Sequence, residues 1–336
     1  MPIPATTSRP RARVVRIGAG WPIAADQAGG KGASLDRLTR MGWAVPPAIC
    51  VTADAFREQL ASIAGAGRLR ALLAALPAAD ARSALVAAFD AAPMLPTLGD
   101  ELAEAVAELD QDLGAAPDPT ADSPPGFDDR DRRPTAFAVR SSALDEDGAV
   151  ASFAGLHETE LGRTATEIEP AVRRCWASLW SIPAIAYRTR RHLPLDHLAM
   201  AVVVQVLVPA TASAVLFTRQ PVTGRDDRIL LTTIRGLGEP MVSGEATPDT
   251  IEVERADRSV VDYSPGRPGM RQFVEHGRIV ERTDPLTTPV LSPDAIGELV
   301  DLGLAVEAAL GHPVDIEAAR AGSSWFLLQA RPITSA

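Results

Sequence analysis

The sequence predicts a protein of mixed α/β (α+β) class, arranged as two lobes or as one domain with a split core. Its 336 residues exceed what one hydrophobic core usually holds. An alanine-rich stretch over 54–113 has the pattern of helices, whereas apolar runs over 198–208, 212–217 and 229–233 have the length of strands. Both kinds of element therefore occur in quantity in the same chain.

The elements near the N-terminus follow from glycines and apolar spacing. A glycine-rich turn at 29–32 precedes a helix that is expected over 33–42, where apolar residues recur at helical spacing. A short buried strand is expected over 45–51. Thr52 or Asp54 then caps the next helix.

Composition divides the rest of the chain. Residues 1–12, rich in proline, threonine, serine and arginine, predict a flexible arm. The first lobe is expected over 13–197, with 54–113 as a helical insert broken by prolines. Residues 114–134, with many prolines and aspartates, predict a disordered loop inside that lobe. The second lobe is expected over 198–336.

Charge and cysteine content exclude several classes of function. With 43 acidic and 33 basic residues the net charge is −10, which argues against broad nucleic-acid binding but not against one positive cleft. Cys50 and Cys175 are too few for a disulfide framework and lack metal-ligand spacing. No signal peptide or apolar run of membrane-spanning length is evident, so we expect a soluble cytoplasmic protein with no membrane partner.

Lys31 is the only lysine in the chain and lies in the turn Gly29-Gly30-Lys31-Gly32. Glycines let the backbone approach an anion closely, and the lysine ammonium is a compact charge suited to a phosphate oxygen. The pattern is not the common phosphate loop, which requires Gly-Lys-Ser/Thr. The alternative is a turn before a helix that happens to hold a lysine.

The last two apolar segments, on either side of a glycine-containing turn, predict a hairpin. Alternation places Asp315 and Glu317 on one face of the first strand, and Gln329 and Arg331 on one face of the second. Pairing brings these faces together into a patch of oxygen ligands suited to Mg²⁺ and a guanidinium suited to phosphate. The alternative is a structural ion pair between Glu317 and Arg331.

Other turns place polar groups beside glycine or arginine, and each is weak evidence alone. Arg140 follows a predicted strand at 136–139 and precedes two serines, which suits either a phosphate contact or a helix cap. His157 lies in a loop of small residues, where a lone histidine is more often structural.

Taken in order, the motifs resemble a known family: the ATP-binding domain of phosphoenolpyruvate synthase, pyruvate phosphate dikinase and rifampin phosphotransferase. The resemblance runs from Gly29 to Thr334, nearly the whole chain. The motifs that carry it include Gly-Gly-Lys-Gly-Ala-Ser-Leu, Val-Pro-Pro, Val-Arg-Ser-Ser-Ala, Ala-Ser-Phe-Ala-Gly, Phe-Thr-Arg-Gln-Pro-Val-Thr-Gly, Gly-Leu-Gly-Glu and Leu-Gln-Ala-Arg-Pro-Ile-Thr.

The resemblance implies an ATP-grasp fold whose two lobes close on ATP and Mg²⁺. Carried over by position, it assigns phosphate binding to Lys31, Arg140 and the nearby Arg219, an adenine-binding hinge to Gln205, Val206, Leu207 and Val208, Mg²⁺ binding to Glu317 and Gln329, and stabilisation of the transferred phosphoryl to Arg331. These roles agree with phosphoryl transfer, which depends on positioning and charge neutralisation.

In the enzymes of this family, a histidine on a swivelling domain accepts the phosphate. No histidine of this chain has the Thr-Ser/Cys-His context of that carrier. We therefore expect the ATP-binding subunit of a split phosphotransferase, acting on a histidine of a separate carrier protein, with the final small-molecule acceptor unknown. The alternatives are a self-sufficient small-molecule kinase or ATP-grasp ligase, a non-catalytic nucleotide sensor, or one domain of a longer polypeptide.

Overall fold

A computed structural model describes residues 12–115, 135–144, 159–193, 198–221, 224–285 and 287–333. The predicted arm and disordered loop lie almost wholly outside these ranges, as does His157. The helices are α1 (Ala25–Arg40), α2 (Ala53–Ala74), α3 (Ala79–Ala91), α4 (Pro96–Ala115), α5 (Ile168–Ala177), α6 (Ile182–Arg190), α7 (Glu239–Val242) and α8 (Pro293–Leu310), with short 3₁₀ turns at Ala165–Glu167 and Ser178–Trp180. Among the described residues, none of these helices combines the length and apolar character needed to cross a membrane.

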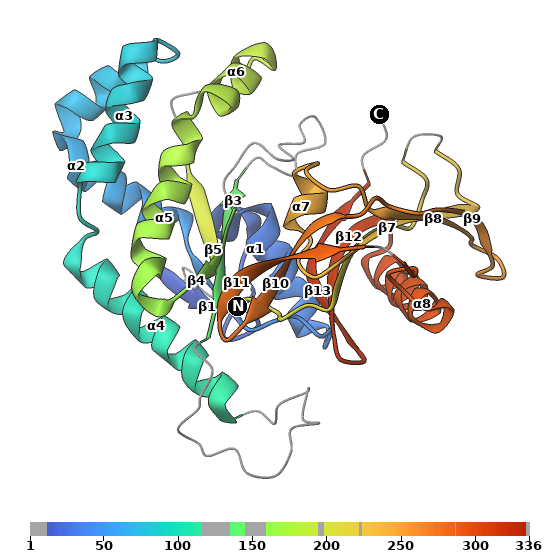
Figure 1. The fold of residues 1–336 in the computed structure, drawn as a ribbon. Helices are drawn as coiled ribbons and strands as arrows, with labels where there is room; N and C mark the ends of the chain where they lie inside the picture. Colours follow the sequence, from blue (N-terminus) through green and yellow to red (C-terminus); the bar gives the residue numbers. More distant parts are fainter. Residues whose placement is uncertain are drawn as a thin grey trace, which may run out of the picture.

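Two antiparallel sheets and a separate hairpin make up the β-structure (Figure 1). The first sheet has the order β1-β2-β5-β3-β4, with strands Val14–Arg16, Ala48–Val51, Met200–Val206, Phe137–Ala143 and Thr159–Arg163. The second has the order β13-β12-β6-β7-β8-β9, with strands Ser324–Pro332, Val314–Ala321, Ala212–Phe217, Arg228–Arg235, Asp249–Glu254 and Val260–Ser264. The hairpin pairs β10 (Gly269–Glu275) with β11 (Arg278–Asp284). The architecture confirms the mixed α+β class.

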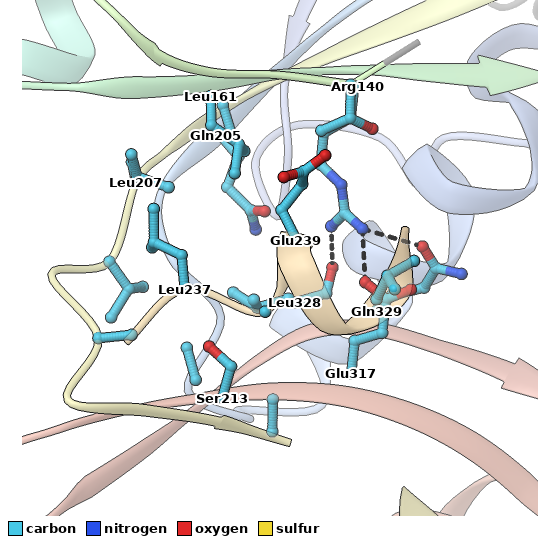
Figure 2. A pocket seen from close by; sticks show the side chains of 18 of the residues that line it. Arg140, Leu161, Gln205, Leu207, Ser213, Leu237, Glu239, Glu317, Leu328 and Gln329 are labelled. Atoms are coloured by element: carbon cyan, nitrogen blue, oxygen red, sulfur yellow. Dashed lines mark hydrogen bonds and ion pairs between the residues drawn. The ribbon is translucent and has the colours of Figure 1, made fainter. Parts of the chain in front are cut away.

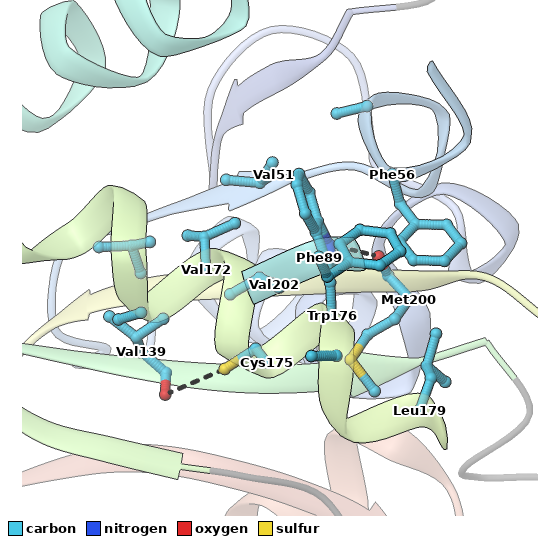
Figure 3. Packing of buried hydrophobic residues seen from close by; sticks show 14 of the residues in the cluster. Val51, Phe56, Phe89, Val139, Val172, Cys175, Trp176, Leu179, Met200 and Val202 are labelled. Atoms are coloured by element: carbon cyan, nitrogen blue, oxygen red, sulfur yellow. Dashed lines mark hydrogen bonds between the residues drawn. The ribbon is translucent and has the colours of Figure 1, made fainter. Parts of the chain in front are cut away.

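The first sheet is covered by helices on both faces. On one face, the helical insert and α5 enclose an apolar core in which Phe56, Phe89 and Trp176 pack together (Figure 3). The indole Nε1 of Trp176 donates a hydrogen bond to Met200 O in β5 at 3.1 Å, so the ring is satisfied as well as buried. On the other face, α1 packs on β3 and β5. Burial on both faces explains why β5 is apolar from Met200 to Val204; Gln205 near its end is the exception.

The helical insert has the segments that its prolines predict. Thr52 precedes α2 and accepts a hydrogen bond from Ala55 N at 3.4 Å, which favours it over Asp54 as the capping residue. α2 and α3 are separated around Pro77, and α4 begins at Pro96, where a helix tolerates proline. Leu85 and Leu98 are buried in the core against the sheet, so the insert supports the first lobe.

The second sheet is covered on one face by α8, whose Leu299 and Val300 pack against buried strand residues. Ser292 caps α8 by accepting a hydrogen bond from Ala295 N at 3.3 Å. The opposite face of this sheet points toward the first sheet, with α1 contacting β13 as well as the first sheet (Figure 1). The two sheets therefore enclose a space between them.

Two expectations about local structure and one about the lobe boundary differ from the structure. The strand that contains Arg140 does not end there: β3 runs on through both serines to Ala143, because all of these residues pair with β5. The helix expected from Ala33 is part of α1, which begins at Ala25 and joins two helical segments across a kink at Gly29, so the glycine-rich segment lies inside α1 and contains that kink. The boundary expected at residue 198 precedes β5, which lies in the first sheet, and the chain changes sheets after Val206.

Candidate nucleotide-binding site

A cavity of about 330 Å³ lies between the two sheets (Figure 2). All but one of the residues to which the family resemblance assigns a role line it: Lys31, Arg140, Gln205, Val206, Leu207, Val208, Glu317, Gln329 and Arg331. These residues come from α1, from both sheets and from the segment that joins β5 to β6. The fold therefore brings together groups that are far apart in sequence.

The polar end of the cavity is organised around Arg140. Its Nη2 donates to Glu317 Oε2 at 2.7 Å and to Gln329 Oε1 at 3.2 Å, and its Nη1 donates to Leu328 O at 2.7 Å. Figure 2 shows the guanidinium extending from β3 to these oxygens of the hairpin β12–β13. Burial raises the pKa of Glu317, but the charges of Arg140, Lys31 and Arg331 outweigh it and leave the pKa below its ordinary value.

An irregularity in the hairpin makes the carbonyl of Leu328 available to Arg140. Glu317 is opposite Gln329, but Ala318 is opposite Leu327, so Leu328 is an extra residue in β13. Such a β-bulge bends the strand and redirects nearby groups, often beside a functional site. The bulge therefore gives Arg140 a backbone acceptor for Nη1 in addition to the two side-chain acceptors of Nη2.

The register places Arg331 opposite Asp315, and its Nε donates to Asp315 Oδ2 at 2.7 Å. The ion pair that the sequence suggested between Arg331 and Glu317 is therefore not the one observed, because the partner of Arg331 is Asp315. Asp315 is only 6% exposed, and this burial raises its pKa, while the adjacent Arg331 acts in the opposite direction. A buried carboxylate holds the guanidinium of Arg331 at the cavity edge.

Lys31 reaches the cavity because α1 is broken at Gly29, whose φ of 67° is left-handed. A Cβ at Gly29 would lie 2.2 Å from Ser142 O, so glycine is required by space as well as by conformation. Ser142 Oγ accepts a hydrogen bond from Gly32 N at 3.1 Å and donates one to Ala28 O at 2.6 Å. The glycine-rich segment is thereby attached to β3 at Ser142, which is two residues after Arg140 in the same strand.

The other end of the cavity is apolar. Leu161 of β4, Leu207 and Leu237 line it, together with Leu328. These side chains belong to a cluster that also includes Ile279 of the hairpin β10–β11. Leu161 comes from the first sheet and Ala319, in the same cluster, from β12 of the second sheet, so the cluster connects both sheets. A flat apolar ligand would be enclosed here.

Gln205 stands between the two ends. It is 2% exposed, and its Nε2 has no hydrogen-bond partner among the described residues. In Figure 2 its amide projects toward the cavity. A buried amide without a partner is costly, so a ligand with a suitable acceptor would be stabilised at this position.

Sequence reasoning did not assign a site role to several lining residues. Glu239, at the start of α7, lies in a motif that the sequence made conspicuous, and burial together with the nearby Glu245 raises its pKa. Leu161 and Met241 also line the cavity, but a single apolar residue in a strand or a short helix carries no signal of its own. Only the assembled fold identifies them.

Arg219 is the predicted site residue that the structure places elsewhere. It forms an ion pair with Asp226, Nε to Oδ1 at 2.5 Å, and is not among the described residues that line the cavity. Arg219 lies in the segment after β6, next to Thr218, whose backbone N donates to Val314 O at the start of β12. In this structure Arg219 therefore does not lie at the polar end of the cavity, where the resemblance placed it beside the phosphates.

The donor set at the polar end fits a hard cation such as Mg²⁺. Glu317 and Gln329 are cross-strand partners, and the oxygens of both side chains already meet at one cationic group. Within the described part of the chain, no group of three or more His, Cys, Asp or Glu side chains is arranged as a metal site. Mg²⁺ commonly takes only one or two protein ligands and completes its shell with water and substrate phosphates.

Cations and oxygen ligands at one end of a cavity, with an apolar wall at the other, are typical of the class of nucleotide-binding sites. Comparison with known proteins agrees. Residues 25–336 match the family model described as pyruvate phosphate dikinase, AMP/ATP-binding domain. The chain belongs to this family, which confirms the resemblance seen in its motifs.

Similar proteins include a probable phosphoenolpyruvate synthase of Methanocaldococcus jannaschii, 36% identical over 92% of this chain and 26% of that protein. A rifampicin phosphotransferase of a Streptomyces species is 36% identical over 92% of this chain and 34% of its own length. The prodigiosin synthesizing transferase PigC of Serratia marcescens is 34% identical over 91% of this chain and 31% of its own length. This chain therefore corresponds to well under half of each of these relatives.

Proposed function

We propose that this chain has an ATP-grasp fold, binds MgATP in the cavity and transfers a phosphoryl group to a histidine on a separate carrier protein. The proposal rests on the convergence of Lys31, Arg140 and Arg331 with Glu317 and Gln329 at one end of a cavity whose other end is apolar. The relatives named as synthases and phosphotransferases support a transfer reaction.

Each part of the cavity has a distinct task in this proposal. The apolar end holds adenine, with the buried Gln205 amide available to a base nitrogen. Lys31, Arg140 and Arg331 neutralise phosphate oxygens, and the Asp315 carboxylate keeps Arg331 aligned. Glu317 and Gln329 would hold Mg²⁺, which when bound supplies additional neutralisation of the phosphate charge.

The acceptor is proposed to come from outside the cavity. His192, His276 and His312 are described, and none of them lines it. In the proposed step, an imidazole nitrogen of the carrier forms a bond to phosphorus while the bond from phosphorus to the leaving oxygen of the nucleotide breaks. Transfer of the γ-phosphoryl leaves ADP, whereas transfer of a pyrophosphoryl group leaves AMP.

The test is nucleotide analysis after incubation with MgATP, performed with the protein alone and with each candidate histidine-carrier protein. Turnover only with a carrier, together with acid-labile phosphate on that carrier, is expected, and AMP or ADP identifies the group moved. A carrier with its histidine replaced by alanine is the matched control. Turnover with a small molecule and no carrier would instead indicate a direct kinase or ligase, and binding without turnover would indicate a sensor.

A further inference from the structure

Arg140 contacts both of the side-chain oxygens that the proposed function assigns to Mg²⁺. One nitrogen, Nη2, donates to Glu317 Oε2 and to Gln329 Oε1, and the other terminal nitrogen donates to Leu328 O. The Arg140 side chain is 10% exposed and that of Glu317 is 27% exposed. The guanidinium is thus a largely buried positive charge at the position where a metal ion would be needed.

A guanidinium and a divalent cation that bind the same carboxylate and the same amide oxygen repel each other, because charges a few ångströms apart interact strongly in a partly buried site. We propose that Arg140 is an internal cation that holds Glu317 and Gln329 in place in the metal-free protein and is displaced when Mg²⁺ enters. This inference rests on the proposed function, since it concerns the same site. The displaced guanidinium then turns to the phosphate oxygens of the nucleotide.

The exchange makes metal binding and nucleotide binding depend on each other. Without nucleotide, Mg²⁺ competes with Arg140 for Glu317 and Gln329 and binds weakly. With nucleotide, phosphate oxygens offer the guanidinium new acceptors, so its release costs less and the metal binds more tightly. Such coupling is reciprocal, so the metal raises nucleotide affinity by the same factor.

The contact also joins the two sheets before any ligand is bound. Arg140 belongs to β3 of the first sheet, whereas its acceptors belong to β12 and β13 of the second. A charge-assisted bond of 2.7 Å between them is among the stronger kinds of hydrogen bond in proteins. Metal and nucleotide binding therefore replaces a direct contact between the sheets by one made through the ligands.

The decisive experiment measures Mn²⁺ binding to the nucleotide-free protein by electron paramagnetic resonance, with Mn²⁺ as the probe for the Mg²⁺ site. The variant Arg140→Gln removes the competing charge, so it is expected to bind Mn²⁺ about tenfold more tightly than the wild type. The same variant is expected to bind ATP more weakly, because it lacks a phosphate ligand. A gain for the metal with a loss for the nucleotide is the signature of the exchange.

Arg331→Gln is the matched control, because it removes the same charge from the same cavity but from a residue whose Nε is bonded to Asp315. It is expected to raise Mn²⁺ affinity far less than Arg140→Gln. Equal gains in Mn²⁺ affinity in the two variants would mean that the loss of any positive charge from the cavity has this effect, and would overturn the proposal. Unchanged or weaker Mn²⁺ binding in Arg140→Gln would overturn it as well.

Thermal unfolding checks that each variant is folded, and Arg140→Met, which keeps an unbranched apolar stem, replaces Arg140→Gln if the latter does not fold. Binding of MgATP to the wild type is measured in parallel. A wild type that binds MgATP, combined with no metal gain in the variants, rejects the exchange and leaves the proposed function standing. A wild type that does not bind MgATP rejects the proposed function itself.

Discussion

The two ends of the cavity are built in different ways. At the polar end, arginines and carboxylates are held by directional hydrogen bonds, as Arg140 with Glu317 and Arg331 with Asp315 show. At the apolar end, Leu161, Leu237 and neighbouring residues enclose space without directional bonds. Directional groups impose a geometry on a reacting centre, whereas apolar contacts mainly hold a ligand in place. Changes at the polar end should therefore lower mainly the rate of transfer, with a loss of ATP affinity as well where Arg140 is replaced, and changes at the apolar end should lower mainly the affinity.

The largest effect is expected for Lys31→Ala. Loss of the ammonium should lower the rate of phosphoryl transfer by about 10³-fold, because a positioned charge at the developing phosphate charge is removed. The fold should persist, since the glycine-rich segment is held by Ser142 through the backbone of its neighbours. The rate is measured with a carrier under saturating MgATP, and thermal unfolding serves as the control. Wild-type activity in the variant would show that Lys31 does not contribute to phosphoryl transfer.

Gly29→Ala tests how that end is supported. An alanine Cβ would overlap Ser142 O, and the left-handed φ adds strain, so we expect a loss of about 3 kcal/mol in the free energy of unfolding. Gly42→Ala is the matched control, because its φ is also positive but no atom lies within 4 Å of the added Cβ. Chemical denaturation measures both. Equal losses would mean that conformation alone, and not the contact with β3, sets the need for glycine.

Arg331→Lys keeps the positive charge but loses the fork that binds Asp315 and a phosphate together. We expect the rate to fall by about 10²-fold with little change in the affinity for ATP. Steady-state kinetics with a varied ATP concentration separates the two quantities. An unchanged rate would assign Arg331 to a purely structural ion pair with Asp315.

The smallest effect is expected at the apolar end. Leu161→Ala removes part of the wall that we assign to adenine, so the KM for ATP should rise about fivefold, which corresponds to about 1 kcal/mol of lost contact. The rate at saturating ATP should stay within about twofold of the wild type, since no directional group is lost. A large fall in that rate, with an unchanged KM, would contradict the division between the two ends.

The sequence predicted the polar end well because its signals are local. Period-two alternation placed Asp315 with Glu317 and Gln329 with Arg331, and the register of the hairpin confirms both pairings of faces. The unique lysine among glycines identified the segment that reaches the cavity. Charged residues at fixed spacing carry such information in the sequence itself.

What the sequence did not predict depends on three-dimensional context. The bulge at Leu328 interrupts the alternation by one residue and leaves no compositional trace. The reach of Arg140 to Glu317 depends on how the two sheets face each other. Leu161 and Ile279 are ordinary apolar residues whose role arises only from the neighbours that the fold gives them.

The break in α1 has a consequence for how this site forms. In an unbroken helix, Gly32 N would donate to Ala28 O, four residues earlier. Here the Ser142 hydroxyl is inserted between these two groups and completes the link, accepting from one and donating to the other. Ser142 is 110 positions from Gly32 in the chain, so a peptide spanning only α1 lacks the group that completes its own helix. The segment that presents Lys31 is therefore not an autonomous folding unit, and it acquires its shape only when the central strands of the first sheet have assembled.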